Sequence, residues 1–264
     1  MVWDRFLPPI GSSKKKKERK FFTKFAEEPL SQTCYIHWYL AQKPRTLLYN
    51  YSLNPYDYIF HYENKYHLSS SRVWSLKKKI QWFNTNSVLI FHDSSLWPSI
   101  QEKFTNFRSL ETNEKTNTYN TYTTYQLSVE TFNPGWIDLD SVIRFPNNRV
   151  NIPKRYRHLT GGIAYGYLKG KEIASFASAP HILQNDEFSF AILRGIETKL
   201  LERKQGYSHK TLTKLCQEIL TDRLIKMIFL WVEKSNQGAI QLYKKLGFVE
   251  DSTIFVAYCD RRRK

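Results

Sequence analysis

The sequence predicts a mixed α/β (α+β) protein made of two domains. In the C-terminal half, short β-rich apolar runs alternate with segments in which apolar residues recur at helical spacing. The polar stretch ETNEKTNTYNTYTT at 111–124 has no apolar periodicity and is predicted to be a linker or a long hairpin tip. The 264 residues are 41% hydrophobic and 16% aromatic, which suits one large or two small cores. We therefore expect a basic flexible tail at 1–20, an N-terminal α/β domain at 21–115 and a C-terminal domain at 120–264.

The N-terminal half is rich in aromatic residues and has mixed patterns. Apolar spacing predicts helices around residues 32–42, 71–83 and 97–107, and the run NSVLIFH at 86–92 predicts a strand. Aromatic side chains interspersed with lysines can stack nucleobases. The same density of aromatic residues is also what a small core uses, so both interpretations stay open.

The elements predicted beyond the linker follow the order β, β, β, α, β, α, β. The first strands come from YQLSVETF at 125–132, GGIAYGYLKGKEIASFASAP at 161–180 and EFSFAILRGIET at 187–198. Within the second of these runs, Lys169-Gly170-Lys171 is predicted to form a hairpin turn. A helix at about 208–220 follows, because its apolar residues form one stripe: Leu212, Leu215, Cys216, Ile219 and Leu220.

The last part of the chain predicts a central strand, a helix and a final strand. MIFLWV at 227–232 is apolar throughout and too short for a helix, so we expect a strand covered on both faces. Ser235 or Asn236 can cap the next helix, which Gly247 ends. Its predicted buried residues are Ala239, Leu242, Tyr243 and Leu246. Phe248 then begins the strand FVEDSTIFVAYC.

The net charge of +16 is concentrated at the two ends of the chain. KKKKERK at 14–20 carries +5 and RRRK at 261–264 carries +4, which leaves +7 for the rest. Short basic ends are commonly solvated tails, and we favour that interpretation over a nucleic-acid clamp. The remaining charge suits a protein with a polyanionic ligand.

The cysteines and the apolar runs exclude several classes of protein. Cys34, Cys216 and Cys259 are scattered and form no CxxC pair, so we expect neither a disulfide framework nor a metal site. No apolar run approaches the roughly 18 residues that cross a bilayer, and the N-terminus lacks the apolar region of a secretory signal. We therefore expect a cytoplasmic protein with no membrane partner.

The connection between the strand at 187–198 and the helix at 208–220 is a candidate phosphate site. Gly206 allows a turn that exposes successive backbone N–H groups beside a positive helix N-terminus. Arg203 and Lys204 add side-chain charge. The alternative is an ordinary strand-to-helix connection in which the glycine merely permits the turn.

Asn236 and Tyr243 are seven residues apart, so they lie on nearly the same face of their helix. The pKa of a phenol is about 10 and that of a thiol about 8.5, so a tyrosine here stays protonated and can donate a proton to a leaving thiolate. Alternatively, Tyr243 is a core aromatic residue whose hydroxyl is satisfied.

Together these residues resemble the GNAT superfamily of acyl-CoA-dependent N-acetyltransferases. The family's pyrophosphate loop, [Q/R]-x-x-G-x-[G/A], is similar to RKQGYS at 203–208, with Ser208 at the position where the family prefers Gly or Ala. Its closing element, N-x-x-A-x-x-L-Y-x-x-x-G-F, is matched by Asn236, Ala239, Leu242, Tyr243, Gly247 and Phe248. The segment from 161 to 208 looks most like the zwittermicin-resistance-type branch. The resemblance covers about residues 120–264.

The resemblance implies an acyl-CoA N-acyltransferase fold with a mixed, splayed β-sheet flanked by helices. The main chain near Ile196 and Thr198 would pair with the pantetheine arm of acetyl-CoA. Arg203 belongs to the loop whose backbone N–H groups would hold the pyrophosphate, those of Lys204, Gln205, Gly206, Tyr207 and Ser208. Asn236 would contact the cofactor or an ordered water, and Tyr243 would be the general acid.

The implied reaction transfers an acetyl group from acetyl-CoA to a primary amine of a small molecule or peptide by direct attack. The amine must be neutral to attack, so a base has to remove its proton. Glu197 is the first candidate, followed by Glu187 and His181, and each of them could instead be an ordinary surface polar residue.

A different class of function remains as an alternative. The fold could serve as a non-catalytic scaffold whose basic surface binds nucleic acid or an acidic partner, although nucleic acid is not favoured. The N-terminal half could be a substrate-binding lid, a degenerate acetyltransferase fold or a partner-binding module.

Overall fold

The computed structural model of the chain describes residues 30–42, 48–49, 58–62, 65–69, 86–108, 115–116, 118–145 and 162–261. Contacts divide the chain into two compact units: unit 1 comprises Met1–Thr123 and Ser252–Lys264, and unit 2 comprises Thr124–Asp251. The predicted C-terminal domain ran on to residue 264, whereas unit 2 ends at Asp251. The predicted tail at 1–20 and the predicted helix at 71–83 lie outside the described residues.

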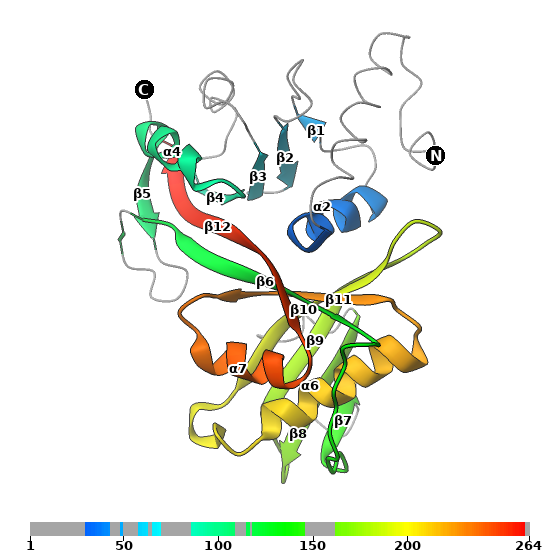
Figure 1. Cartoon of the computed structure of the whole chain (residues 1–264). Helices are drawn as coiled ribbons and strands as arrows, with labels where there is room; N and C mark the ends of the chain where they lie inside the picture. Colours follow the sequence, from blue (N-terminus) through cyan, green and yellow to red (C-terminus); the bar gives the residue numbers. More distant parts are fainter. Residues whose placement is uncertain are drawn as a thin grey trace. The chain divides into compact units, whose positions relative to one another are not determined.

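The described part of unit 1 combines a mixed sheet with the helices α2 and α4 (Figure 1). In its sheet the strand order is β1-β2-β3-β4-β12, where β12 is Val249–Arg261, and β5 pairs with β12. The pairs β1–β2 and β2–β3 are antiparallel, and β3–β4 is parallel. The elements of this unit are α2 (Leu30–Gln42), β1 (Leu48–Tyr49), β2 (Tyr58–Tyr62), β3 (Lys65–Ser69), β4 (Asn86–Phe91), η3 (Ser94–Leu96), α4 (Trp97–Lys103) and β5 (Phe104–Arg108).

The core of unit 1 is aromatic, which is the second of the two roles that the sequence left open for these residues. The ring of Trp97 lies 4.8 Å from that of Phe107 and 5.1 Å from that of Tyr119, measured between centroids. Such pairs contribute about 0.5–1.5 kcal/mol each beyond the area they bury. The buried residues of this core are Tyr66, Leu68, Leu89, Phe91, Leu96, Ile100, Phe104, Phe107, Ala257 and Cys259.

Two predictions on this part of the chain are wrong. The helix expected at 97–107 ends at Lys103, and β5 follows. Phe104 and Phe107 have helical spacing, but the backbone of Asn106 between them is left-handed (φ 52°), and β5 pairs with β12 instead. The linker expected at 111–124 is wrong over its last residues, because β6 begins at Asn120 and Thr123 and Thr124 are buried in it.

Unit 2 is built on a sheet with the strand order β6-β11-β10-β9-β8-β7. Strands β7 to β10 pair antiparallel in sequence, and β10–β11 is the parallel pair. The elements are β6 (Asn120–Ser128), β7 (Val142–Phe145), β8 (Ile163–Lys169), β9 (Glu172–Gln184), β10 (Ser189–Thr198), η4 (Leu200–Glu202), α6 (Tyr207–Gln217), the π-helix η5 (Glu218–Asp222), β11 (Met227–Glu233), α7 (Gln237–Lys245) and β12 (Val249–Arg261).

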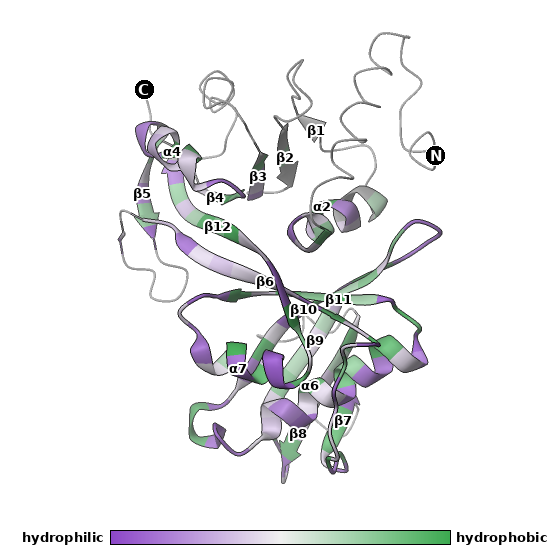
Figure 2. Cartoon of the chain, viewed as in Figure 1, coloured by the Kyte–Doolittle hydropathy of each residue, from purple (hydrophilic) through white to green (hydrophobic). Residues whose placement is uncertain are grey.

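Helices α6 and α7 cover one face of this sheet (Figure 1). Figure 2 shows hydrophobic and hydrophilic residues alternating along both ribbons, as amphipathic helices require. Their apolar sides share one core with the sheet; among its members are Leu193 of β10, Leu215 of α6, Leu230 of β11 and Tyr243 of α7. The mixed α/β fold with helices flanking a sheet confirms the predicted fold class.

Several local predictions for unit 2 are confirmed. Residues 169–171 form the turn between β8 and β9, with Gly170 left-handed. The Asn236 side chain caps α7 by accepting a hydrogen bond from the Ala239 N–H at 3.2 Å. Gly247 ends the helix with a φ of 93°, and a Cβ there would lie 1.7 Å from the Thr131 carbonyl oxygen. Only glycine fits at such a position.

The sequence analysis missed β7 and the π-helix. β7 is only four residues long, which is too short for a periodic signal. The apolar stripe predicted for 208–220 continues through both α6 and η5, so spacing alone does not reveal where the α-helix gives way to a π-turn. None of the described helices is long and apolar enough to cross a membrane.

Candidate active site

The parallel strands β10 and β11 separate partway along their length. They pair only from Phe190 to Ile192 on β10 and from Met227 to Phe229 on β11. β10 then continues to Thr198 with β9 as its neighbour, and its register is shifted on both sides of Arg194. Gly195 in this stretch has a left-handed backbone (φ 64°). The result is the splayed gap that the sequence resemblance implied, closed at Ile192 and open toward Thr198.

The open end of β10 leads into the N-terminus of α6. Gly206 is the N-cap, with a φ of 77°, a conformation that glycine adopts without strain. The first hydrogen bond of the helix joins the Lys210 N–H to the Gly206 carbonyl at 3.1 Å. The N–H groups of Tyr207, Ser208 and His209 come before it and have no partner within the helix. With no acidic residue in the first turn, this N-terminus suits an anion.

The β8–β9 hairpin holds the segment that precedes α6. Lys169 Nζ lies 3.0 Å from both carboxylate oxygens of Glu202, and Lys199 pairs with Glu172. The rings of Tyr167 and Tyr207 are stacked with their centroids 4.1 Å apart. Each exposed ion pair is worth less than about 1 kcal/mol, but together these contacts fix where the loop lies.

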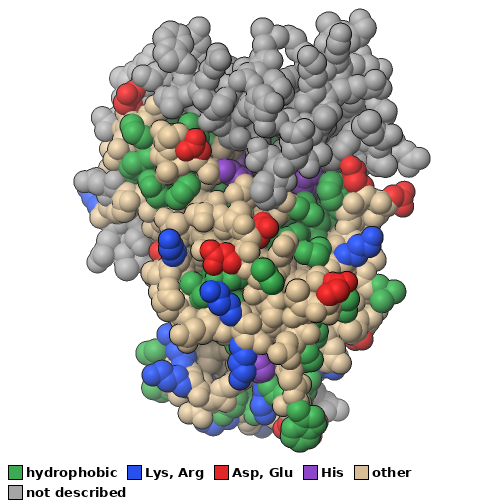
Figure 3. Space-filling view, in the orientation of Figure 1, with side chains coloured by type: hydrophobic (Ala, Val, Ile, Leu, Met, Phe, Trp, Pro, Cys, Tyr) green, Lys and Arg blue, Asp and Glu red, His purple; other side chains and the backbone are tan. Residues whose placement is uncertain are grey.

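The surface around this loop is basic. Arg203 and Lys204 are exposed, and Arg203 Nε donates to the Thr198 carbonyl at 3.3 Å. Figure 3 shows basic side chains at the lower end of the visible face, over the region where α6 begins in Figure 1. Positive charge beside a helix N-terminus strengthens the attraction for a phosphate.

Tyr243 lies on the inner side of α7 and is 6% exposed. Its ring contacts those of Phe248 and Tyr125, with centroids 5.7 and 6.5 Å away. Burial raises the pKa of its hydroxyl well above the ordinary value, and Cys216 adds to the shift. The phenol is therefore protonated at neutral pH, as a proton donor must be, although the same surroundings also suit a core aromatic residue.

The other predicted residues are spread along the gap. Ile196 and Thr198 lie on the part of β10 that has left β11, and the Thr198 hydroxyl donates to Ser175 Oγ at 3.1 Å. Glu197, half-buried, is opposite Phe176 of β9, whereas His181 of β9 is opposite Ile192 at the closed end. Glu187 is exposed and precedes β10, at the end away from the gap.

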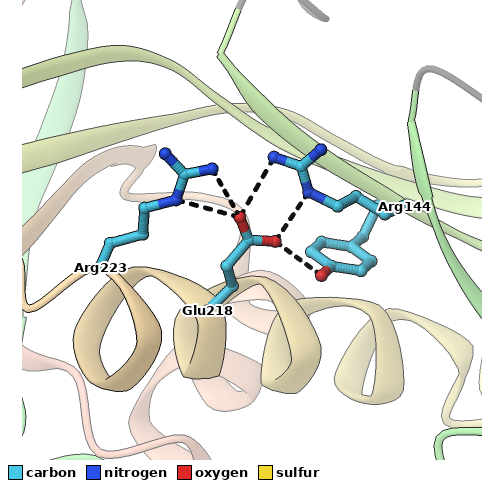
Figure 4. Close-up of polar contacts among 4 residues, drawn as sticks. Arg144, Glu218 and Arg223 are labelled. Carbon is cyan, nitrogen blue, oxygen red and sulfur yellow. Dashed lines mark hydrogen bonds and ion pairs between the residues drawn. The ribbon is translucent and has the colours of Figure 1, made fainter.

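A buried carboxylate behind α6 escaped the sequence analysis (Figure 4). Glu218, 7% exposed, accepts hydrogen bonds from Arg144 Nε at 2.9 Å, Tyr165 Oη at 2.7 Å and Arg223 Nε at 3.2 Å. Burial works against its ionisation, but the hydrogen bonds from Arg144 and Tyr165 lower its pKa. The cluster ties η5 to β7 and β8. Its members are far apart in the sequence, so no local motif announces it.

Three comparisons with known proteins bear on this site. Residues 122–248 match the model of a family described as Acetyltransferase (GNAT) family. A solved structure from Drosophila melanogaster has a TM-score of 0.60 and 13% identity, over 96% of this chain and 98% of that chain. A GNAT-family structure from Novosphingobium aromaticivorans has a TM-score of 0.51 and 13% identity, over 78% of this chain and 89% of that chain. A conserved protein from Staphylococcus epidermidis has a TM-score of 0.54 and 9% identity, over 81% of this chain and 95% of that chain. No curated protein matches the chain.

The fold and the family match define an acyltransferase. More narrowly, residues 122–248 form a GNAT acetyltransferase domain, as the sequence resemblance implied. The likeness of fold is not confined to the C-terminal half, because the Drosophila structure is matched over nearly the whole chain. The zwittermicin-resistance branch stays a prediction.

Proposed function

We propose that unit 2 transfers an acetyl group from acetyl-CoA to a primary amine by direct attack. The observation that carries this proposal is the continuity of two features. The gap between β10 and β11 opens directly toward the free N–H groups at the start of α6. An extended arm that ends in a pyrophosphate fits this arrangement, with the arm along β10 and the phosphates at the helix N-terminus.

The cofactor would be held mainly by backbone groups. The main chain of Ile196 and Thr198 has no β11 partner and is available to the two amides of the pantetheine arm. The N–H groups from Lys204 to Ser208 would hold the pyrophosphate, with Arg203 supplying charge. Ser208 adds one hydroxyl beyond a glycine, which is small enough for the backbone to remain close to the phosphates. Asn236 would reach the cofactor through an ordered water, because its side chain already caps α7.

Tyr243 would protonate the thiolate of coenzyme A as it leaves. Its raised pKa keeps the proton on the phenol at neutral pH, so the hydroxyl can hydrogen-bond the departing thiolate and donate to it. Because a thiolate is a weaker base than a phenolate, the raised pKa itself opposes complete transfer, and the phenolate is reprotonated in a later step. The sequence offers three candidates for the base that deprotonates the amine of a small-molecule or peptide acceptor: Glu197, Glu187 and His181. Coenzyme A supplies the activated acyl group, and no metal takes part in this proposal.

Calorimetry with acetyl-CoA, followed by free-thiol release with a panel of amines, tests the proposal. We expect saturable binding of acetyl-CoA and thiol release that depends on one class of amine. Tight binding without release by any amine would favour the non-catalytic scaffold. Absence of binding by the folded chain would overturn the cofactor assignment.

A further inference from the structure

We propose that His181, rather than Glu197, accepts the proton of the attacking amine. This inference rests on the proposed acetyl transfer and concerns the place where its chemistry occurs. Three features support this assignment: the place of the thioester along the gap, the face of the sheet on which His181 lies, and the charged side chains on the same face.

The thioester lies toward the closed end of the gap. If the two amides of the pantetheine arm pair with Thr198 and Ile196, the sulfur end of the arm extends beyond Ile196 toward Ile192. Ile192 is the last β10 residue that pairs with β11, where its partner is Phe229. The reacting carbonyl is therefore near the point at which the two strands meet.

His181 is the residue beside that point on β9. The register of the β9–β10 ladder places it directly opposite Ile192. Glu197 is five residues further along β10, which corresponds to about 16 Å of extended strand. A carboxylate at that distance lies beside the pantetheine arm, not beside the carbonyl.

The alternation of side chains places His181 on the face of the sheet opposite α6 and α7, where Phe190, Ile192 and Phe229 are also buried. Its neighbour Ile182 packs against the core beneath the helices, so His181 points the other way. Ala191 and Leu193 of β10 belong to the same core, and Ile192 between them therefore also faces away from it. Tyr243 approaches from the helix side. Acid and base thus approach the carbonyl from opposite faces of the sheet.

Among the described residues of β9, β10 and β11, strand alternation places two charged side chains on the same face as His181: Arg194 of β10, opposite Ser178, and Glu233 at the end of β11. Phe229 lies four residues before Glu233 on β11 and therefore on the same face, where its ring packs against that of Phe190. An unperturbed imidazole has a pKa of about 6.5, so a histidine can take up a proton near neutral pH and release it again.

In this reaction one C–N bond forms, one C–S bond breaks, and every proton has a donor and an acceptor. The His181 imidazole takes one proton from the substrate ammonium, and the amine lone pair forms the new C–N bond to the thioester carbonyl. The C–S bond then breaks, and the thiolate takes the phenolic proton of Tyr243. The second proton on the new amide nitrogen returns through water to the phenolate, and the imidazolium releases its proton to solvent.

The test compares His181→Gln with Glu197→Gln, using acetyl-CoA and the best amine from the panel. For His181→Gln we expect kcat at pH 7 to fall 10²- to 10⁴-fold, the range for a lost general base, with an unchanged Kd for acetyl-CoA. Its residual rate should rise with pH as the free amine becomes available, and added imidazole should restore part of the activity. Glu197→Gln should stay within a few-fold of the wild type.

A His181→Gln variant with near-wild-type kcat, or a collapse confined to Glu197→Gln, would overturn the assignment while leaving the acetyl transfer intact. A wild-type chain that releases no thiol with any amine would overturn the acetyl transfer and this inference together. A loss of acetyl-CoA binding in His181→Gln would show that the residue supports the fold of the site.

Discussion

The described elements of units 1 and 2 agree in part of their order, and among the described residues the features of a cofactor site lie in unit 2. In each unit an antiparallel run of strands leads to a parallel pair, β3–β4 or β10–β11, which is followed by a helix, α4 or α7. After each helix a left-handed residue precedes a buried phenylalanine: Asn106 and Phe107 in unit 1, Gly247 and Phe248 in unit 2.

The two units differ in the features that make up the candidate cofactor site of unit 2: the separation of the parallel strands, the glycine and the tyrosine. β3 and β4 pair from Lys65–Val88 to Leu68–Phe91, up to the last residue of β4, whereas β10 leaves β11 after three pairs. The chain between β3 and β4, residues 70–85, contains no glycine, and α4 (WPSIQEK) contains no tyrosine. The comparison supports the interpretation of the N-terminal half as a degenerate acetyltransferase fold, which stays a prediction.

The chain also passes between the two units within two strands. β6 begins in unit 1 and continues in unit 2, where its neighbour is β11. β12 begins in unit 2 and continues in unit 1, where Phe255 to Asp260 pair with Phe91 to Asn86. Each sheet therefore includes a strand that follows the helix of the other unit.

The largest expected difference between the units is their response to acid. Burial lowers the pKa of His37 and of His67 to about 3 and that of His92 to about 4. His92 Nδ1 lies 2.7 Å from Gln32 Oε1, while Gln32 Nε2 donates to the Thr253 carbonyl, so the neutral imidazole donates through Nδ1. These groups are neutral when folded but take up protons when unfolded.

Because the folded pKa values are depressed, the stability that depends on neutral histidines is present above the unfolded pKa of about 6.5 and is lost as the pH falls from there toward 4. At pH 5 each histidine would lower the free energy of unfolding of unit 1 by about 2 kcal/mol. Hydrogen exchange at pH 7 and pH 5, corrected for intrinsic rates, should show β4 losing more protection than β8. Equal losses in the two strands would contradict the prediction.

The second largest effect is expected for Tyr243 of α7, since α4 of unit 1 contains no tyrosine. Tyr243→Phe keeps the ring and its packing but removes the proton, so kcat should fall ten- to a thousand-fold with little change in the Kd for acetyl-CoA. Because burial raises the pKa of the phenol, the wild-type rate should show no loss from its ionisation near pH 10, the ordinary pKa of a tyrosine. Tyr119→Phe, in the core of unit 1, is the matched control. Full activity of Tyr243→Phe would make Tyr243 a core aromatic residue only.

The glycine at the start of α6 has no counterpart among residues 70–85. Gly206→Asp adds backbone strain at a φ of 77° and a negative charge beside the phosphates, so acetyl-CoA should bind about 10- to 100-fold more weakly. Gly135→Asp is a matched control, because Gly135 is also left-handed (φ 65°) and has equally open surroundings. Calorimetry measures both variants. Unchanged affinity in a folded Gly206→Asp chain would exclude the loop as the phosphate site.

The smallest expected effect comes from the basic ends of the chain. Deletion of residues 1–20 and 262–264 should leave kcat/KM for a small amine within a few-fold of the full chain, because short basic ends are commonly solvated charge runs whose interactions are screened by salt. Thiol release under matched salt conditions measures the change. A collapse of activity in a folded, shortened chain would instead indicate that the ends capture an anionic substrate.

The sequence by itself determined the local features of unit 2. Asn236 as a cap, Gly206 and Gly247 at helix ends, and the 169–171 turn each depend on backbone geometry within about four residues, so their spacing could be read without the fold. The same local signals carried the resemblance to the acetyltransferases and therefore the candidate cofactor loop.

Tertiary structure alone decided the features that depend on strand register and on distant partners. The run at 104–108 has helical apolar spacing, yet it forms a strand because β12, more than a hundred residues away in the chain, pairs with it. The Glu218 carboxylate can be buried in η5 because Arg144 of β7 and Tyr165 of β8 donate hydrogen bonds to it. His181 is near the closed end of the gap because the β9–β10 register brings it opposite Ile192, and a shift of one residue would turn it to the other face.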